Sequence, residues 1–179
     1  EKGAKVKSFN PELNSEEQTA LDKIAELWNK KSRNIHDFYS SAMTETSKQF
    51  DLQPGSAKTI FELNHGGRIL GIEMDPAGVF EGIARNIDLK ITWDGEQIPA
   101  VFCPAADFFG YAFGKASMQS LLSGTDDTRN YCYFPMPFDN KVKIELIYRE
   151  IEAASLKPVK ISVRIWYSDE KRDAAKEGK

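Results

Sequence analysis

The side chains of this sequence whose types and spacing could do chemistry are carboxylates. Glycoside hydrolysis needs two of them beside the scissile bond, one protonated and one ionised. Asp94, Glu96 and Asp107 fall within one stretch, residues 87–110. Asp94 directly precedes Gly95, and this pair is typical of a tight turn, which explains Asp94 without chemistry. Asp107 and Glu96 therefore remain as the candidate catalytic residues.

Aromatic rings supply a second device for handling sugars, because a flat ring packs against the apolar C–H face of a pyranose or furanose. Aromatic residues make up 11% of the sequence and gather between positions 93 and 138. The candidate substrate-binding residues are Trp93, Phe109, Tyr111 and Tyr131. Packing in the hydrophobic core is the alternative interpretation of the same rings.

Histidine and cysteine give little support to other chemistries. His36 and His65 are the two histidines, too few for a histidine-rich metal site, and a Ser-His-Asp triad would need one of them. Cys103 and Cys132 lack CxxC spacing. We expect two free thiols, no metal and no cofactor, with a disulfide between the cysteines as the alternative in an oxidising compartment.

Composition limits the partners. The formal net charge is −3 and the isoelectric point is about 5.5, with lysine and arginine spread evenly along the chain. Nucleic-acid and anionic-membrane partners call for a concentrated basic face, so neither is expected. No apolar run is long enough to predict a membrane span. The 179 residues fit one domain with a small appendage.

A helix is predicted near the start of the chain. Ser15 to Gln18 reads as a capping box, and Leu21, Ile24, Ala25 and Trp28 follow at helical spacing, which predicts an amphipathic helix over residues 15–31. We divide the chain into an arm and helix (residues 1–35, with residues 1–10 as the polar arm), a sandwich (residues 36–168) and a polar tail (residues 169–179).

Strands account for the rest. Apolar and polar residues alternate over residues 87–93, 142–148 and 159–167. After the Asp94-Gly95 turn we expect a return strand over residues 96–102, and we expect residues 60–63 and 69–74 to form a hairpin. Residues 118–122 suggest a short helical turn within a long loop, and prolines make residues 130–138 an edge or crossing strand. The predicted fold is mainly β: a jelly-roll-like antiparallel β-sandwich with one N-terminal amphipathic helix, and an immunoglobulin-like sandwich is the second choice.

Two segments, WDGEQIPAVFCPAADFFG and NYCYFPMPF, resemble domain-of-unknown-function family 2961, whose characterised members form glycoside hydrolase family 172. The resemblance covers about residues 50–168. It implies one half of a tandem of jelly rolls, homo-oligomers, sugar sites near subunit interfaces, and a secreted or periplasmic location. The implied partners are a carbohydrate and either a second jelly roll or further copies of the chain.

The sequence departs from the family pattern at two positions. Where the catalytic half of the family carries glutamates, this chain has Asn86 and Ala106. Neither side chain can act as nucleophile or general acid. We therefore predict a module that supports assembly or glycan contact without completing catalysis, and whether the chain is an enzyme stays open. The alternatives are a furanoside hydrolase that uses Asp107 with Glu96, and a purely structural or protein-binding sandwich.

Overall fold

The structure is a computed structural model that describes residues 10–30, 34–40, 42–151 and 155–178. The chain divides into two units, Glu1–Lys31 and Ser32–Lys179, each described here by itself. The predicted polar arm lies, except for Asn10, outside the described residues.

The first unit contains the predicted helix, α1 (Ser15–Asn29). It is capped by Asn14 rather than by Ser15, so the predicted capping box is wrong by one position. The Asn14 side chain accepts hydrogen bonds from the backbone N–H groups of Glu16 (3.0 Å) and Glu17 (2.9 Å), and the Glu17 carboxylate accepts from the Asn14 N–H (3.0 Å). Ser and Asn serve equally well as caps, and composition alone did not separate them. Lys31, the predicted last residue, lies outside the described residues.

The second unit is built from two antiparallel sheets and a small hairpin. Sheet A, of six described strands, contains β1 (Thr44–Leu52), β3 (Gly67–Asp75), β8 (Ser123–Thr125), β9 (Asn130–Cys132), β10 (Met136–Phe138) and β12 (Val159–Ser168). Sheet B, of four described strands, contains β2 (Ala57–Leu63), β4 (Ile87–Trp93), β5 (Val101–Pro104) and β11 (Val142–Tyr148). The hairpin pairs β6 (Tyr111–Ala112) with β7 (Lys115–Ala116), and the short helical turns are η1 (Ile35–Asp37), η2 (Gly82–Asn86) and α2 (Ala105–Phe108).

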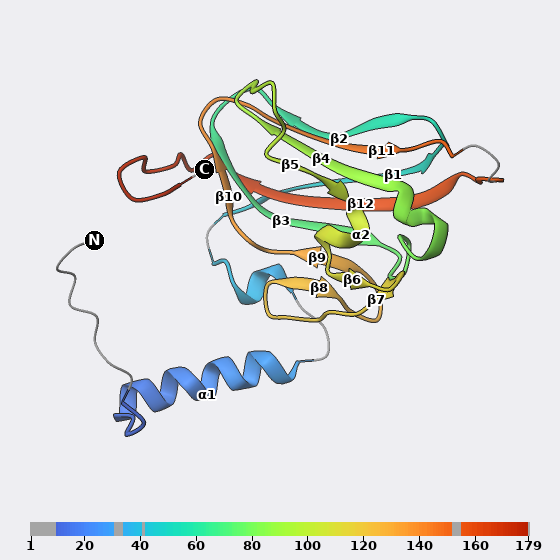
Figure 1. Cartoon of the computed structure of the whole chain (residues 1–179). Coiled ribbons are helices and arrows are strands. Elements are labelled where there is room, and N and C mark those ends of the chain that lie inside the picture. The colour runs from blue at the N-terminus through green and yellow to red at the C-terminus, as the bar shows by residue number, and fades with distance from the viewer. Residues whose placement is uncertain (1–9, 31–33, 41, 152–154, 179) are drawn as a thin grey trace. The chain divides into compact units, whose positions relative to one another are not determined.

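The strand pairing follows jelly-roll order. The first strand, β1, pairs with the last, β12; β2 pairs with β11; β3 pairs with β9 and β10; and β4 pairs with β5. One long antiparallel hairpin rolled into two layers gives this nesting. Figure 1 shows the layer of β2, β11, β4 and β5 facing the layer of β1, β12, β3, β9 and β8. The prediction of a mainly β antiparallel sandwich with one N-terminal helix is confirmed.

The core lies between the two sheets and follows the alternation in the sequence. On β4, Leu89 and Ile91 are fully buried, and on β11 Ile144 and Leu146 are too. Each fully buried aliphatic side chain of this size contributes about 1.5–3 kcal/mol relative to its exposed state. The regular dry faces of these strands therefore hold the two sheets together.

A second, smaller apolar cluster covers the outer face of sheet A. It consists of Ile35, Leu70, Tyr131, Tyr133 and Trp166, with Phe38, Tyr39, Met43 and Leu122 packed against it. The segment around η1 and the loop before β8 therefore shield this face from solvent. The covered face explains why β3 reads as an almost continuously buried strand rather than an alternating one.

Three local predictions are wrong. Strands β2 and β3 do not form a hairpin, because β2 pairs with β11 in sheet B and β3 belongs to sheet A; both carry apolar residues on the core face, so alternation could not tell their sheets apart. The return strand after Gly95 is confined to β5 and begins only at Val101. Residues 118–122 are not helical: Gln119 forms a β-bridge with Gly124, the Met118 carbonyl accepts the Thr125 N–H at 2.8 Å, and residues 121 and 122 form a bend before β8.

The C-terminal segment, predicted as a polar tail, is tied to the sandwich by arginine–carboxylate pairs. Arg68 on β3 donates two hydrogen bonds to Glu177 (3.0 and 2.8 Å), and Arg172 donates two to Asp139 (3.1 and 3.0 Å). Within the described part of the chain, no helix combines the length and apolarity that crossing a membrane requires.

Candidate functional site

Asp107, the first catalytic candidate, lies on the single turn of α2 directly after β5. Its carboxylate is gripped by Arg85 of η2, whose Nη2 lies 2.9 Å from Oδ2 and whose Nε lies 3.2 Å from Oδ1. At the same end of sheet B, Asp88 pairs with Arg149 at 2.7 Å. Both carboxylates thus have an arginine as a close partner.

The two positions that depart from the family pattern lie at this same end of sheet B. The Asn86 side chain donates its amide hydrogen to the Ile83 carbonyl at 2.9 Å. Ala106 is buried, with 1% of its surface exposed. Asn86 makes a local hydrogen bond to the backbone and Ala106 packs in the core, so neither position supplies an acid beside Asp107.

Glu96, the second catalytic candidate, lies at the opposite end of β4. The strand β4 runs from Ile87 to Trp93, with Asp107 beyond its first residue and Glu96 beyond its last. At about 3.3 Å per residue, the two carboxylates are roughly 20 Å apart. A hydrolytic pair requires about 5–9.5 Å, so Asp107 and Glu96 of one chain do not form such a pair.

Asp94 has a structural task in the turn after β4. Asp94 (φ 51°) and Gly95 (φ 74°) both adopt positive φ, as a type I′ turn requires. The Asp94 carboxylate accepts the backbone N–H groups of Asp139 (3.1 Å), Asn140 (2.6 Å) and Lys141 (3.1 Å). It thereby joins the β4 turn to the loop that leads into β11.

The four predicted substrate-binding rings are all buried. Trp93 stacks on Phe138 with ring centroids 6.1 Å apart, and Phe109 stacks on Phe80 at 6.0 Å. The Tyr111 hydroxyl donates to Asn130 Oδ1 (2.7 Å), and the Tyr131 hydroxyl donates to the Ser120 carbonyl (2.5 Å). In this chain the four rings pack in the core, and the two tyrosines also make buried hydrogen bonds. A role in substrate contact stays a prediction.

Both cysteines are free thiols. Cys103 is half-buried on β5 of sheet B, whereas Cys132 is buried on β9 of sheet A. Burial raises the pKa of each thiol above its ordinary value, and for Cys103 the nearby carboxylates of Asp107 and Asp88 raise it further. A thiol of raised pKa is a poor nucleophile at neutral pH.

A polar cleft of about 460 Å³ opens between two loops, residues 77–81 and residues 116–127. Its walls are joined by a weak hydrogen bond from the Ala116 N–H to Glu81 Oε1 (3.4 Å). The side chains that line it offer carboxylate, amide and hydroxyl groups together with one thioether: Glu81, Ser117, Met118, Gln119, Thr125, Asp126 and Asp127. Among these described lining residues there is no lysine or arginine.

An exposed ring lies at the tip of the hairpin that borders this cleft. Phe113 and Gly114 form the tip of the β6–β7 hairpin, both at positive φ (53° and 76°), and Ala116 at the end of β7 lines the cleft. The Phe113 side chain is fully exposed. The left-handed conformation costs a residue with a Cβ about 1–2 kcal/mol, and such strain concentrates at functional positions. The Gly82 N–H donates to the Gly114 carbonyl at 3.3 Å, which holds the tip against the first loop.

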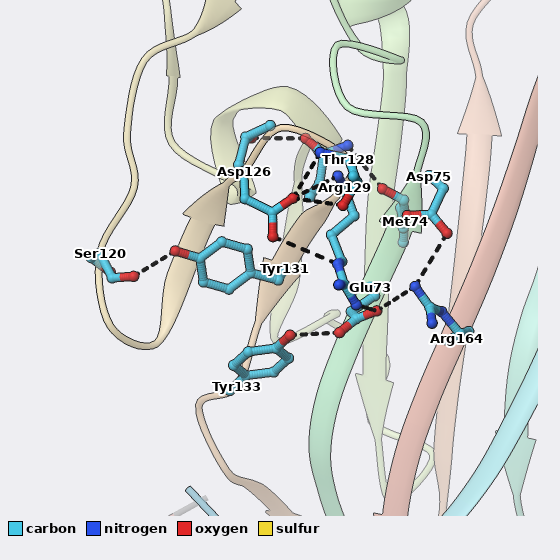
Figure 2. Close-up of polar contacts among 12 residues, drawn as sticks. Glu73, Met74, Asp75, Ser120, Asp126, Thr128, Arg129, Tyr131, Tyr133 and Arg164 are labelled. Atoms are coloured by element: carbon cyan, nitrogen blue, oxygen red, sulfur yellow. Dashed lines mark hydrogen bonds and ion pairs between the residues drawn. The ribbon is translucent and has the colours of Figure 1, made fainter. Parts of the chain in front are cut away.

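A buried charge network supports the wall of the cleft (Figure 2). Glu73 on β3 is 1% exposed, and its Oε1 accepts a hydrogen bond from the Tyr133 hydroxyl (2.5 Å). Two arginines share its Oε2, which accepts from Arg129 Nη1 (2.8 Å) and lies 2.7 Å from Arg164 Nη2. Arg129 Nε also lies 3.6 Å from Asp126 Oδ2. A buried carboxylate is costly unless it is paired and hydrogen-bonded, and Glu73 is both.

The protonation of this network follows from its contacts. Burial alone would raise the pKa of Asp126, but hydrogen bonds from the N–H and hydroxyl of Thr128 and from the Arg129 N–H lower it below its ordinary value. Burial and the Glu73 carboxylate raise the pKa of Tyr133, which therefore stays a neutral donor. The network is a charged scaffold that fixes the loop 126–129, and Glu73 itself is out of reach of a substrate.

Sequence reasoning located neither the cleft nor the network. The long loop that the sequence predicted around residues 118–122 does supply one wall of the cleft. Glu73 had a readable signal, since it is the one carboxylate within the apolar run from Ile69 to Met74 on β3. Phe113 had one too, because a phenylalanine before Gly114 is an unusual residue at a hairpin tip. No group of three or more histidine, cysteine, aspartate or glutamate side chains in the described residues is placed to hold a metal ion.

A comparison with protein-family models matches residues 42–161 to the family described as GH172 domain-like. The chain belongs to this family. The GH172 domain-like match begins just before β1 and ends at the start of β12, so it spans most of the sandwich and leaves α1 outside. No curated protein matches the chain.

Two solved structures are similar to this GH172 domain-like chain at 12% sequence identity. One is the acidic stable capsid structure of Helicobacter pylori bacteriophage KHP30, with a TM-score of 0.41 over 71% of this chain and 87% of that one. The other is PliG of Aeromonas hydrophila, a periplasmic inhibitor of g-type lysozyme, with a TM-score of 0.35 over 72% of this chain and 89% of that one.

Proposed function

We propose that this chain is a GH172 domain-like module that contacts a glycan without hydrolysing it. The observation that carries the proposal is the polar cleft together with the exposed ring of Phe113 at the tip of the hairpin that borders it. A sugar presents an apolar C–H face and a rim of hydroxyl groups. The ring suits the first, and Glu81, Gln119 and Asp127 suit the second.

The charge of the cleft narrows the glycan class. Glu81, Asp126 and Asp127 line it; Arg129 offsets the buried Asp126, and the described lining residues include no lysine or arginine beside Glu81 and Asp127. Desolvating an acidic ligand beside these carboxylates is unfavourable, so uronic acids and sulfated sugars are disfavoured. The expected ligand is a neutral oligosaccharide.

The absence of hydrolysis is supported by the positions of the acids. Asp107 is held by Arg85, Glu96 lies at the other end of β4, and Asn86 and Ala106 stand where the family resemblance implies glutamates. The other carboxylate at this end of the sandwich, Asp88, is engaged by Arg149, so neither Asp88 nor Asp107 is held ready as one acid of a conventional pair. Assembly with further copies or with a second jelly roll stays part of the proposal.

Binding is tested by titrating the full chain with a panel of neutral and acidic oligosaccharides in a calorimeter. Phe113→Ala should weaken binding of a neutral glycan about 3- to 10-fold, as expected for one ring contact. Phe102→Ala is the matched control, since this ring is also exposed but belongs to β5 of sheet B. Equal affinity of wild type and Phe113→Ala, or a preference for acidic glycans, would sink the proposal.

Hydrolysis is tested separately with arabinofuranoside and fructofuranoside reporters. We expect no turnover by the wild type. Turnover by the wild type would reject the non-hydrolytic function. If Asp107→Asn loses this turnover, Asp107 takes part in hydrolysis; if the turnover is unchanged, Asp107 has no role in it.

A further inference from the structure

The helix α1 presents an apolar stripe that its own unit does not bury. Along one side lie Leu13, Leu21, Ile24 and Trp28, exposed by 38%, 51%, 52% and 56%, and no residue of α1 is buried. The first half of the stripe is hollowed into an apolar groove of about 530 Å³, lined by Pro11, Leu13, Glu17, Ala20, Leu21 and Ile24. A stripe of this spacing is the form that a helix uses to pack on another helix.

Isolated helices of about 12–15 residues are marginal in water, even with good caps. The 15-residue α1 has a complete capping box, which contributes at the level of about 1 kcal/mol. A tertiary or intermolecular contact along the apolar stripe is therefore expected to supply most of its stability.

Charges along α1 are unevenly placed. From Ser15 to Asp22 the helix carries Glu16, Glu17 and Asp22 and no base, whereas from Lys23 to Asn29 it carries Lys23 and Glu26, and Lys30 follows as its C-cap. The two acids of the first turn also favour a single helix through its dipole, and its last turn carries no base. An antiparallel helix pair gains more, because the acidic first half of each helix lies beside Lys23 and Lys30 of the other.

The positions of the charges around the helix indicate the same orientation. Glu16, Lys23 and Lys30 are spaced by seven residues, so they line one flank of the stripe, while the other flank carries Asn14, Gln18 and Ala25. A parallel pair would place the charged flank of one helix against the uncharged flank of the other. An antiparallel pair places the charged flank against itself, with Glu16 opposite the lysines.

We propose that α1 is a dimerisation element that pairs antiparallel with α1 of a second copy of this chain. The apolar stripes face each other, and the apolar groove beside Leu13 receives the C-terminal part of the partner stripe. The element lies outside the GH172 domain-like match, so it adds an interface to the sandwich and does not depend on the proposed glycan contact.

The test is sedimentation equilibrium of the full chain over a concentration series, where we expect a monomer–dimer equilibrium. Ile24→Ala removes one stripe side chain from each helix of the dimer and should raise the dissociation constant at least about tenfold. Glu26→Ala is the matched control, because Glu26 lies on the side of α1 opposite Ile24 and should leave the constant unchanged.

A charge-reversal cycle tests the orientation. Glu16→Lys alone should weaken the dimer, and so should the pair Lys23→Glu and Lys30→Glu, since each leaves flanks of like charge opposed. All three together restore opposite charges and should bring the constant back to within about threefold of wild type. A monomer at every concentration, or a dimer indifferent to Ile24→Ala, would overturn the proposal, and failure of the triple reversal to restore pairing would overturn the antiparallel orientation.

Discussion

The hydroxyl of Tyr133 lies 2.5 Å from the Glu73 carboxylate, and both side chains are buried on the outer face of sheet A. Tyr133 comes from the chain directly after β9 and Glu73 from β3, sixty residues apart in sequence. This bond therefore fastens the segment that follows the cleft loop to the central strand of the sheet. Glu73 is placed to hold structure, in contrast to the exposed carboxylates of Glu81 and Asp127 in the cleft.

Loss of this bond should cost more than loss of an ordinary tyrosine hydrogen bond. We expect Tyr133→Phe to lower the free energy of unfolding by about 1.5–3 kcal/mol, because the acceptor is a buried charged group. The matched variant is Tyr39→Phe, which removes a 2.7 Å bond to the Tyr133 carbonyl and should cost about 0.5–1.5 kcal/mol. Urea denaturation monitored by fluorescence measures both. Equal losses would contradict the claim that the hydrogen bond from Tyr133 to the charged Glu73 stabilises the protein more than the hydrogen bond from Tyr39 to a carbonyl.

Asp126 should make the stability of the sandwich sensitive to acid. Its folded-state pKa is lowered, so its contribution is present above the unfolded pKa of about 3.9 and disappears as the pH falls through the folded value. Asp126→Asn holds the side chain neutral and should cost about 1 kcal/mol at neutral pH. The gap between the two proteins should close as the pH drops below about 4.

The neighbouring exposed Asp127 supplies the control for this experiment. Asp127→Asn should change the free energy of unfolding by less than about 0.5 kcal/mol at either pH. Unfolding curves at neutral and acidic pH test the claim, which fails if Asp126→Asn stays equally destabilised in acid.

Alternation of apolar and polar residues predicted the fold well because sheet B follows it strictly. On β4 and β11 every second residue faces the core, and both strands were identified from sequence. Alternation does not indicate which of the two sheets a strand joins. The incorrect prediction of a β2–β3 hairpin has this cause, because the chain at Gly66 and Gly67 crosses from sheet B to sheet A instead of reversing within one sheet.

The candidate site was less readable for a different reason. Trp93 and Phe109 fit a sugar platform and a core position equally well in composition, and burial on both faces separates the two only in three dimensions. Asp107 and Glu96 are eleven positions apart in sequence, yet the segment between them, which runs back along β4 and includes β5, carries them to opposite ends of sheet B. The cleft forms from loops around positions 80 and 120, and no periodicity reports such a meeting.

Gly71 on β3 should resist substitution because two side chains occupy the space of a Cβ. A Cβ built there would overlap the Ile35 Cδ1 and come within 3.1 Å of the Tyr133 ring. Gly71→Ala should therefore lower the free energy of unfolding by about 1–3 kcal/mol through overpacking. Ile35→Val removes the overlapping methyl group, so Gly71→Ala with Ile35→Val should lose less than the sum of the single losses. Additive losses in urea denaturation would contradict a direct clash between residues 35 and 71.

Asp94 should be the most sensitive of the carboxylates near the end of β4. Asp94→Ala removes the acceptor of three backbone N–H groups and leaves a residue with no side-chain acceptor at positive φ, so we expect a loss of about 2–3 kcal/mol. Asp94→Asn keeps an acceptor oxygen and tolerates positive φ, so it should lose about 1 kcal/mol or less. Glu96→Ala, two positions along in the exposed loop, should stay within about 0.5 kcal/mol of wild type. Chemical denaturation ranks the free energies of unfolding of the three variants. A loss in Glu96→Ala as large as that in Asp94→Ala would contradict the claim that Asp94 is the carboxylate that stabilises this turn.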